Sequence, residues 1–302
     1  MKKILLFVGI ATFTLSSFAQ EPTKTDTTVV KADTIIVYKN DTTRIGKILI
    51  IKKHKKNYGD SVSIITDSSS MIVKKKSKIT TNFIVFDLGF ANWIDKTNYA
   101  TAGSYVVTKA GTPAFSADDM RLRAGKSVNV NIWFFMQKIA LIKNNVNLKY
   151  GLGVELQNYS FRSPISFKED GIIPYSGGAI TNSPFIFRDS ITFTKNKLAT
   201  KYLTIPVMLN FAANNKTSKR GFGASVGVSF GYLYKQRNKQ KSSLYGKQRN
   251  QGDYNLQKFK FSYTAEAGLG SFRLFGSYTP KSIFENSLDI RPYNIGLRFS
   301  NW

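Results

Sequence analysis

Cysteine is absent from the sequence, and histidine occurs once, as His54 in the basic stretch KKHKK at 52–56. The missing cysteine excludes disulfides, thiolate metal sites, a catalytic thiol and a lipidated cysteine. Since no histidine occurs after residue 54, a hydrolytic mechanism with a histidine general base is excluded from the rest of the chain. A lysine-based mechanism stays open, but no motif supports one. We therefore expect no enzymatic activity, no cofactor and no metal, and we interpret His54 as a solvated residue.

Acidic residues are scarce: 18 Asp and Glu stand against 44 Lys and Arg, a formal net charge of +26. Such a charge predicts attraction to anionic surfaces such as lipid phosphates or acidic polysaccharide, and says nothing about fold. No later segment has the length and apolarity of a transmembrane helix. The opening MKKILLFVGIATFTLSSFAQ has a basic start, a short apolar run and a small-residue cleavage pattern. We predict that residues 1–19 are a cleaved signal peptide and that the protein is exported to the bacterial envelope, a retained anchor being the alternative.

Residues 20–80 differ in composition from the rest of the chain. They are rich in Thr, Asp, Ser and Lys, with short β-branched runs such as GKILIIKK and DSVSIITD and a second basic cluster at 74–76. This composition offers too little apolar surface for a sizeable core. We interpret 20–80 as a basic periplasmic segment that is largely extended or disordered, with a weak hairpin as the alternative.

Residues 81–302 contain long segments in which apolar residues alternate with small or polar ones. The clearest is GFGASVGVSFGYLY at 221–234, with Phe222 to Tyr234 at even positions and Gly or Ser at the odd positions from 221 to 231. Alternation with period two is typical of a strand with two different faces. The segments are 82–93, 127–138, 145–157, 201–211, 221–234, 258–270, 271–278 and 293–302. In the second segment we place Met136 on the apolar face and Gln137 on the polar face.

The connections between these segments alternate between short and long. Single-chain outer-membrane barrels have an even number of strands, short periplasmic turns and longer extracellular loops. A soluble barrel such as a lipocalin would have an apolar interior, whereas here the face opposite the apolar rows carries charges. The sequence thus predicts an all-β fold: an eight-stranded antiparallel up-and-down transmembrane β-barrel over 81–302, located in the outer membrane.

Charged residues from several segments share the face that we assign to the interior. They are Asp87, Lys149, Glu155, Lys260, Glu266, Arg273 and Arg298. An eight-stranded barrel is only wide enough for its own side chains, so charges inside it must pair with one another or with water. We expect a structural plug, and a gated pore is the alternative.

The sequence KQRN occurs twice, at 235–238 and 247–250, on either side of the turn-like SSLYG. The two copies could extend the hairpin of the fifth and sixth strands. Basic residues here form a candidate anion-binding loop for lipopolysaccharide phosphates or an acidic partner, with a solvated loop as the alternative. They are Lys235, Arg237, Lys239, Lys241, Lys247 and Arg249. Export to the envelope argues against a nucleic-acid partner.

Four stretches, SFAQ, FDLGFANWIDKTNY, KYLTIPVMLNF and NIGLRF, resemble the PorT-like outer-membrane β-barrel proteins of Bacteroidetes. The proline within the third stretch is its most specific feature, because proline is disfavoured inside strands. The resemblance covers most of 81–302 and implies a non-enzymatic barrel; one branch of that family is associated with protein secretion. The C-terminus also resembles the signal read by the barrel-assembly machinery, through Gly296 and Phe299. Trp302 has the opposite parity, so a plain last strand with an interfacial tryptophan is an equal alternative.

We expect a non-enzymatic structural or surface-interaction protein with a plugged lumen and long extracellular loops. A component of a secretion system, which would bind a periplasmic protein through the N-terminal segment, is one alternative. A narrow channel or uptake protein is the other. The partners expected for all three are outer-membrane lipid, lipopolysaccharide and the barrel-assembly machinery.

Overall fold

The computed structural model describes residues 79–142, 145–212 and 221–300, and the backbone of five short strands that precede them. The chain divides into two units, Met1–Ser77 and Lys78–Trp302. The predicted signal peptide, His54 and Trp302 lie outside the described residues. Among the described residues there is no α-helix, and no helix is long and apolar enough to cross a bilayer.

Short strands occur in the N-terminal unit. The strands β2 (Thr42–Ile45), β3 (Ile48–Lys53) and β4 (Ser61–Thr66) form a three-stranded antiparallel sheet, and β1 (Val29–Val30) pairs with β5 (Met71–Ile72). Strands β3 and β4 coincide with the two β-branched runs of this segment, as expected for residues that favour extended backbone. The other residues of the predicted segment 20–80, apart from Ile79 and Thr80, lie outside the described part.

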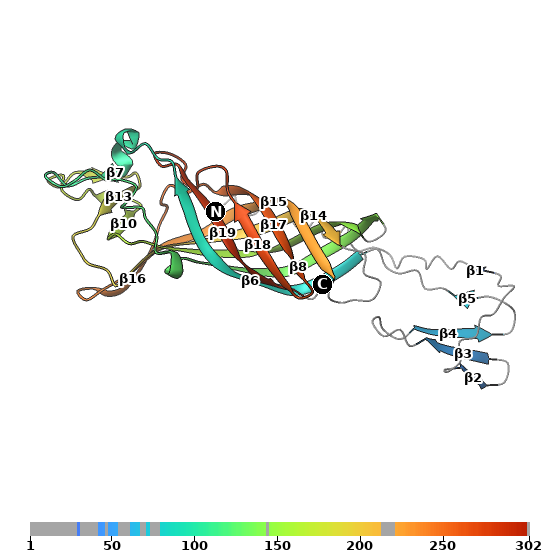
Figure 1. Ribbon diagram of the computed structural model, residues 1–302. Coiled ribbons are helices and arrows are strands. Elements are labelled where there is room, and N and C mark those ends of the chain that lie inside the picture. The colour runs from blue at the N-terminus through green and yellow to red at the C-terminus, as the bar shows by residue number, and fades with distance from the viewer. Residues whose placement is uncertain are drawn as a thin grey trace, which may run out of the picture. The chain divides into compact units, whose positions relative to one another are not determined.

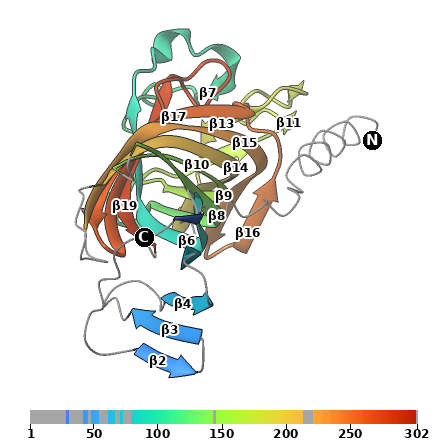
Figure 2. The same ribbon diagram turned by 90° about the vertical axis from the view of Figure 1, so that its right-hand side faces the viewer.

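A single large, barrel-like sheet dominates the second unit (Figure 1). Its strands are β6 (Ile79–Asp95), β8 (Val128–Ile142), β9 (Val146–Ser160), β14 (Lys195–Ala212), β15 (Phe222–Ser242), β16 (Gly246–Gln251), β17 (Phe259–Leu269), β18 (Phe272–Tyr278) and β19 (Ile290–Phe299). Each alternating segment of the sequence falls on one of these strands. Every pairing is antiparallel, and β14 pairs with both β9 and β15 while β19 pairs with β6. The pairings therefore return to their starting strand, and Figure 2 shows the strands arranged around an interior.

The connections at the two ends of this sheet differ in length. At one end they are 143–145, 213–221 and 270–271. At the other end they are 96–127, 161–194, 243–258 and 279–289, which we call the cap. The cap contains β7 (Val106–Val107), β10 (Ile165–Lys168), β11 (Gly171–Ile172), β12 (Ile180–Thr181) and β13 (Phe185–Arg188), and three short 3₁₀ turns. Strands β10, β13 and β7 form a small sheet of their own.

Buried aromatic residues hold the cap together. Within the connection 161–194 the rings of Phe161 and Phe167 lie 5.6 Å apart, and rings of different connections lie 5.7 Å apart for Phe167–Tyr254 and 6.0 Å apart for Tyr105–Phe284. The Tyr105 hydroxyl donates a hydrogen bond of 2.9 Å to the backbone oxygen of Tyr254. All four long connections therefore share one hydrophobic core, which continues into the sheet through Trp93. The sequence prediction of separate long loops did not include this core.

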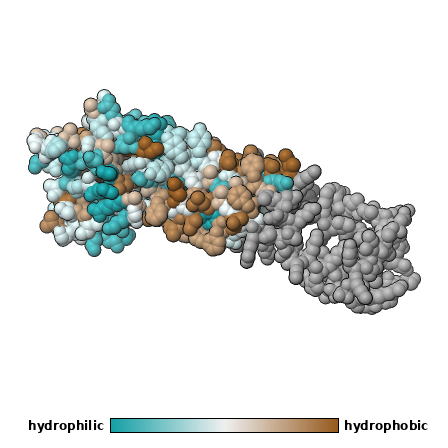
Figure 3. Space-filling model, viewed as in Figure 1, coloured by the Kyte–Doolittle hydropathy of each residue, from teal (hydrophilic) through white to brown (hydrophobic). Residues whose placement is uncertain are grey.

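The two faces of the large sheet differ as the alternation predicts. Outward apolar side chains stay exposed on seven of the eight strands of the closed circuit, for example Phe90 at 62% and Phe230 at 53%, and those of β9 are half-buried, whereas Asp87 and Lys149 are 0% exposed. Hydrophobic residues cover this part of the sheet, and hydrophilic residues cover the end that carries β7, β10, β13 and β16 (Figure 3). The outer face thus has the polarity of a protein interior.

A β-bulge corrects one detail of the predicted faces. The register between β8 and β9 shifts between Trp133 and Phe135, so that the alternation of β8 reverses beyond this point. Met136, which the sequence pattern placed outside, is fully buried against Val85 and Trp133. An extra residue in one strand of a pair turns all later side chains to the opposite face. The predicted placement of Met136 was therefore wrong, as was that of Gln137.

Candidate functional site: a charge network inside the sheet and a basic outer face

The first and last strands of the large sheet, β6 and β19, are joined in its interior by an ion pair. Asp87 on β6 lies directly opposite Arg298 on β19. The guanidinium donates from Nε to Oδ1 and from Nη2 to Oδ2 of Asp87, both at 2.7 Å. Asn131 Nδ2 and Trp133 Nε1 from β8 also donate to Oδ2, at 3.0 and 2.7 Å. Such a two-pronged, charge-assisted fork is among the stronger hydrogen-bonded arrangements in proteins.

Glu266 on β17 connects this pair to the opposite wall. It accepts hydrogen bonds from Arg298 Nη1 and from Lys149 Nζ on β9, and its Oε1 lies 3.5 Å from Arg273 Nη1 on β18. The Ser225 hydroxyl on β15 donates to the same carboxylate at 2.8 Å. These side chains are buried, so removing Glu266 would leave the cations around it without their shared carboxylate in a medium of low dielectric constant.

A second ion pair crosses the interior closer to the cap. Lys260 Nζ on β17 donates to Glu155 on β9, and the same ammonium lies 4.5 Å from the centroid of the Tyr202 ring. Both side chains are at most 5% exposed. The structure therefore brings together all seven charged residues that the sequence assigned to the interior, in two clusters that both join β9 to β17.

The interior is filled rather than open at this level. A cavity of only about 20 Å³ lies between the clusters, lined among others by Trp133, Glu155 and Arg298. That volume is close to the space that one water molecule needs. Among the described residues, no group of three or more His, Asp or Glu side chains could hold a metal ion. The carboxylates are instead held by cations and hydrogen-bond donors.

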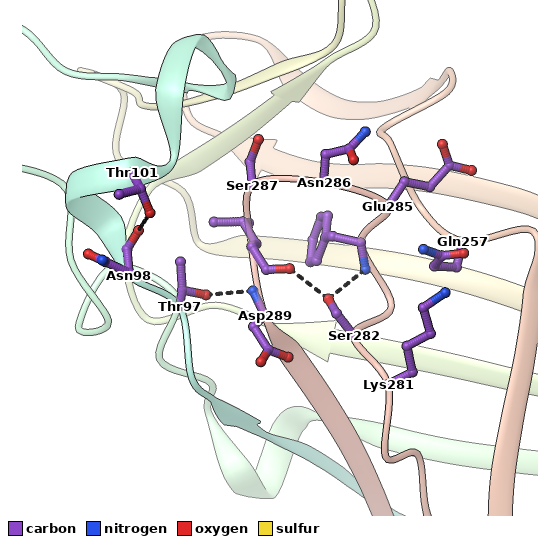
Figure 4. A pocket seen from close by; sticks show the side chains of 12 residues that line it. Thr97, Asn98, Thr101, Gln257, Lys281, Ser282, Glu285, Asn286, Ser287 and Asp289 are labelled. Atoms are coloured by element: carbon purple, nitrogen blue, oxygen red, sulfur yellow. Dashed lines mark hydrogen bonds between the residues drawn. The ribbon is translucent and has the colours of Figure 1, made fainter.

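A shallow pocket of about 350 Å³ lies on the surface of the cap (Figure 4). It is formed by the segments 97–101 and 281–289 together with Gln257. Thr97 Oγ1 accepts a 2.9 Å hydrogen bond from the backbone N–H of Asp289, and Ser282 Oγ donates to the Leu288 oxygen at 2.7 Å. The first bond joins the two segments and the second lies within 281–289, so Thr97 and Ser282 on the lining of the pocket hold the cap together. The sequence offered no pattern that indicated this pocket.

The predicted anion-binding loop forms an extended hairpin, as its repeated KQRN suggested. The outward apolar residues of the large sheet form a band around it, which on β15 ends at Tyr234; we call it the apolar band. Strand β15 continues beyond this band to Ser242 and pairs with β16. In this pairing Lys239 lies opposite Arg249 and Lys241 lies opposite Lys247. On its other edge β15 pairs with β14, which adds basic residues that the sequence prediction missed. They are Lys195, Lys197 and Lys201. All three have odd residue numbers, so they share one face of the strand, and this period-two pattern could have identified them.

Two of the three residues of the predicted assembly signal are described. Gly296 lies opposite Gly89, and a Cβ at Gly296 would meet the backbone of β6 and come 2.7 Å from the Phe275 ring. Phe299 lies on the outer face, 5.6 Å from the Phe272 ring. Gly296 is therefore required for the close contact between the first and last strands of the sheet.

A comparison with models of protein families identifies the family to which this chain belongs. Residues 96–285 match the family model described as outer membrane protein beta-barrel domain. A search of curated proteins finds no match. The matched region covers more than half of the chain and includes the strands that carry most of the interior network. The chain therefore belongs to the outer membrane protein β-barrel family and is an outer-membrane protein.

Proposed function

We propose that the protein is an eight-stranded transmembrane β-barrel that does not conduct and that presents its cap outside the cell. The eight strands are those of the closed circuit, with β16 as an extension of the β15 edge. In this proposal it acts as a structural or surface-interaction protein without catalytic activity, and a cleaved signal peptide directs its export. The observation that carries the proposal is the exposed apolar outer face.

The size of that face supports the transmembrane assignment. About two dozen outward apolar side chains, each roughly half exposed, amount to on the order of 2,000 Å² of apolar surface. A soluble monomer rarely exposes a contiguous apolar patch of more than a few hundred Å². In a bilayer every backbone group must be paired within a closed sheet, and the pairing of β19 with β6 meets that requirement. Hydrocarbon is thus a better solvent than water for this face.

The filled interior and the packed cap favour a closed barrel over a channel. A conducting pore needs a continuous water-filled path, whereas the Glu266 and Glu155 clusters join opposite walls and the cap core lies beyond one end. Planar-bilayer recordings of the purified protein test this point. We expect no discrete conductance. Regular single-channel steps would contradict the plugged lumen and support the channel alternative.

The secretion-system alternative and the PorT-like subgroup rest on the sequence resemblance. In that alternative, residues 20–80 bind a periplasmic protein while the barrel anchors them. Deleting 21–78 from the full chain, which leaves β6 (Ile79–Asp95) intact, and assaying secretion separates the two functions. A structural role predicts normal secretion by the deletion strain, whereas a secretion component predicts its loss with the barrel still in the membrane.

The transmembrane assignment has its own direct test. Outer membranes that contain the protein are extracted with detergent, and samples with and without boiling are compared by gel electrophoresis. A closed barrel migrates differently before and after boiling, and surface protease cleaves only cap segments. A chain recovered as a monomer in the soluble fraction without detergent would refute the assignment.

A further inference from the structure

Basic side chains form a two-dimensional array on the outer face of the sheet, above the apolar band. Directly opposed residues of antiparallel strands point to the same side. The pairings place Lys241 between Lys195 and Lys247, and Lys239 between Lys197 and Arg249. We call the array the basic face: Lys195, Lys197, Lys201, Lys235, Arg237, Lys239, Lys241, Lys247 and Arg249.

The spacing of this face concentrates positive charge. Neighbouring strands lie about 5 Å apart, and residues two apart along a strand lie about 7 Å apart. Like charges directly opposite each other destabilise a sheet. Burial and the neighbouring charge of Lys195, followed by those of Lys201 and Arg237, lower the pKa of Lys239. The array is therefore unfavourable by itself and suited to a ligand with several negative charges.

Acidic side chains in the described part of the chain do not neutralise the basic face. Among the ion pairs between described residues, none includes a member of this array. Arg237 Nε donates to Gln251 Oε1 at 3.3 Å, and Lys197 Nζ donates to the backbone oxygen of Lys126 at 2.9 Å. Both acceptors are neutral, so the positive charge of the array is not compensated by these contacts.

The position of the face indicates the ligand. On β14 the outward row continues without interruption from Lys201 to Leu203 and Ile205, which are 40% and 48% exposed. On β15 the array begins directly after Tyr232 and Tyr234, whose rings are suited to a membrane interface. A ligand that covers both regions has an acyl part beside the apolar rows and anionic groups beside the lysines.

We propose that the basic face binds the phosphate groups of a lipid in the outer leaflet, such as the bisphosphorylated glycolipid that anchors lipopolysaccharide. This inference rests on the proposed transmembrane orientation and adds a specific partner to it. The lipid's acyl chains lie along β14 and β15, and its phosphates lie between the rows of cations. Three strands contribute to the site, so that it does not depend on the hairpin loop alone.

The test compares the full-length wild-type protein with the variant K197Q/K239Q/R249Q, which removes the middle row. The control K109Q/K168Q/K281Q removes the same charge from exposed positions in the cap. Each protein is purified in a zwitterionic detergent, and binding of bisphosphorylated lipid A is measured by native mass spectrometry. One basic residue near an anionic surface changes binding about fivefold, so we expect about 100-fold weaker binding for the variant and little change for the control.

Three further probes make the result specific. Dephosphorylated lipid A is expected to bind wild-type protein as weakly as intact lipid A binds the variant. Equal binding of inorganic phosphate would show a free-anion site, and equal binding of polyglutamate would show an acidic protein partner; either result overturns the proposal. Unchanged lipid A binding by the variant, or an equal loss in the control, also overturns it.

The outcome can be separated from that of the proposed function. Heat-modifiable mobility and membrane fractionation are recorded for all three proteins. If wild-type and variant both form membrane barrels but neither binds lipid A, only this inference fails. If the wild-type protein does not enter the membrane, the transmembrane proposal itself fails. The variant is expected to fold at least as well as wild type, because it loses like-charge repulsion.

Discussion

Replacing Arg298 with methionine tests whether the interior network stabilises the sheet. The change removes the fork to Asp87 and one donor to Glu266, and keeps a side chain of similar length. Asp87 then retains only two neutral donors, from Asn131 and Trp133. Breaking a buried ion pair by removing one partner costs about 3–5 kcal/mol. We expect the free energy of unfolding of R298M to fall by that amount.

The same strand provides a matched control. Arg291 makes an equivalent fork to Asp289, with distances of 2.8 and 2.7 Å, but these side chains are 29% and 35% exposed. Solvent screens exposed pairs and leaves them little net contribution to stability, so R291M should be nearly neutral. The hydrogen bond from Arg291 lowers the pKa of Asp289. The contribution of this exposed pair is therefore present at neutral pH and is lost as the pH falls through that lowered pKa.

Urea titration in detergent micelles at pH 7 measures the free energy of unfolding of wild type, R298M and R291M. The folded fraction is read from gel mobility without boiling. If R298M and R291M lose the same free energy within about 0.5 kcal/mol, the reasoning from burial is refuted. The double variant D87N/R298M adds a second check. It removes both charges, so it should recover part of the loss because no carboxylate is left without its cation.

Two other predictions concern the seam between the first and last strands and the cap. The free energy of unfolding of G296A should fall by about 1–3 kcal/mol, and the variant should assemble more slowly into the heat-modifiable form, because its Cβ would come 2.7 Å from the Phe275 ring. The control G276A should assemble normally, because the nearest atom to its Cβ would be 3.7 Å away. Equal assembly of the two glycine variants would contradict this. F167A should lose about 3–5 kcal/mol of cap stability, seen as faster protease cleavage of the cap with unchanged gel mobility. The control Y245A changes a side chain that is 62% exposed, and equally fast cleavage of both would show that the aromatic core is not what protects the cap.

The faces of the strands could be predicted from the sequence because period-two alternation follows directly from strand geometry. The burial of Lys149 and the exposure of Phe230 both follow from it. The bulge at Phe134 could not be located in this way, because Phe134 and Phe135 are alike and either could begin the reversed alternation. Met136 was consequently assigned to the wrong face.

The sequence pattern also could not predict which interior charges pair with each other, or that the cap has a hydrophobic core. Arg298 and Asp87 are separated by 211 positions, and only the closure of the sheet decides which acid a given cation meets. The cap residues have no regular period that extends over a long segment, because they lie on short strands of two to six residues and on the irregular stretches between them. Apolar residues within predicted loops, such as Phe185 and Phe187, were the one available indication of a core there.

The fork between Asp87 and Arg298 joins the earliest strand of the large sheet to the latest one. A chain interrupted before β19 would leave the carboxylate of Asp87 inside the sheet without its guanidinium, and both edges of the sheet open. Closure of the sheet and the pairing of Asp87 with its cation therefore depend on the same strand. An incomplete copy is therefore destabilised twice, by a buried carboxylate without its cation and by two sheet edges with unpaired backbone groups.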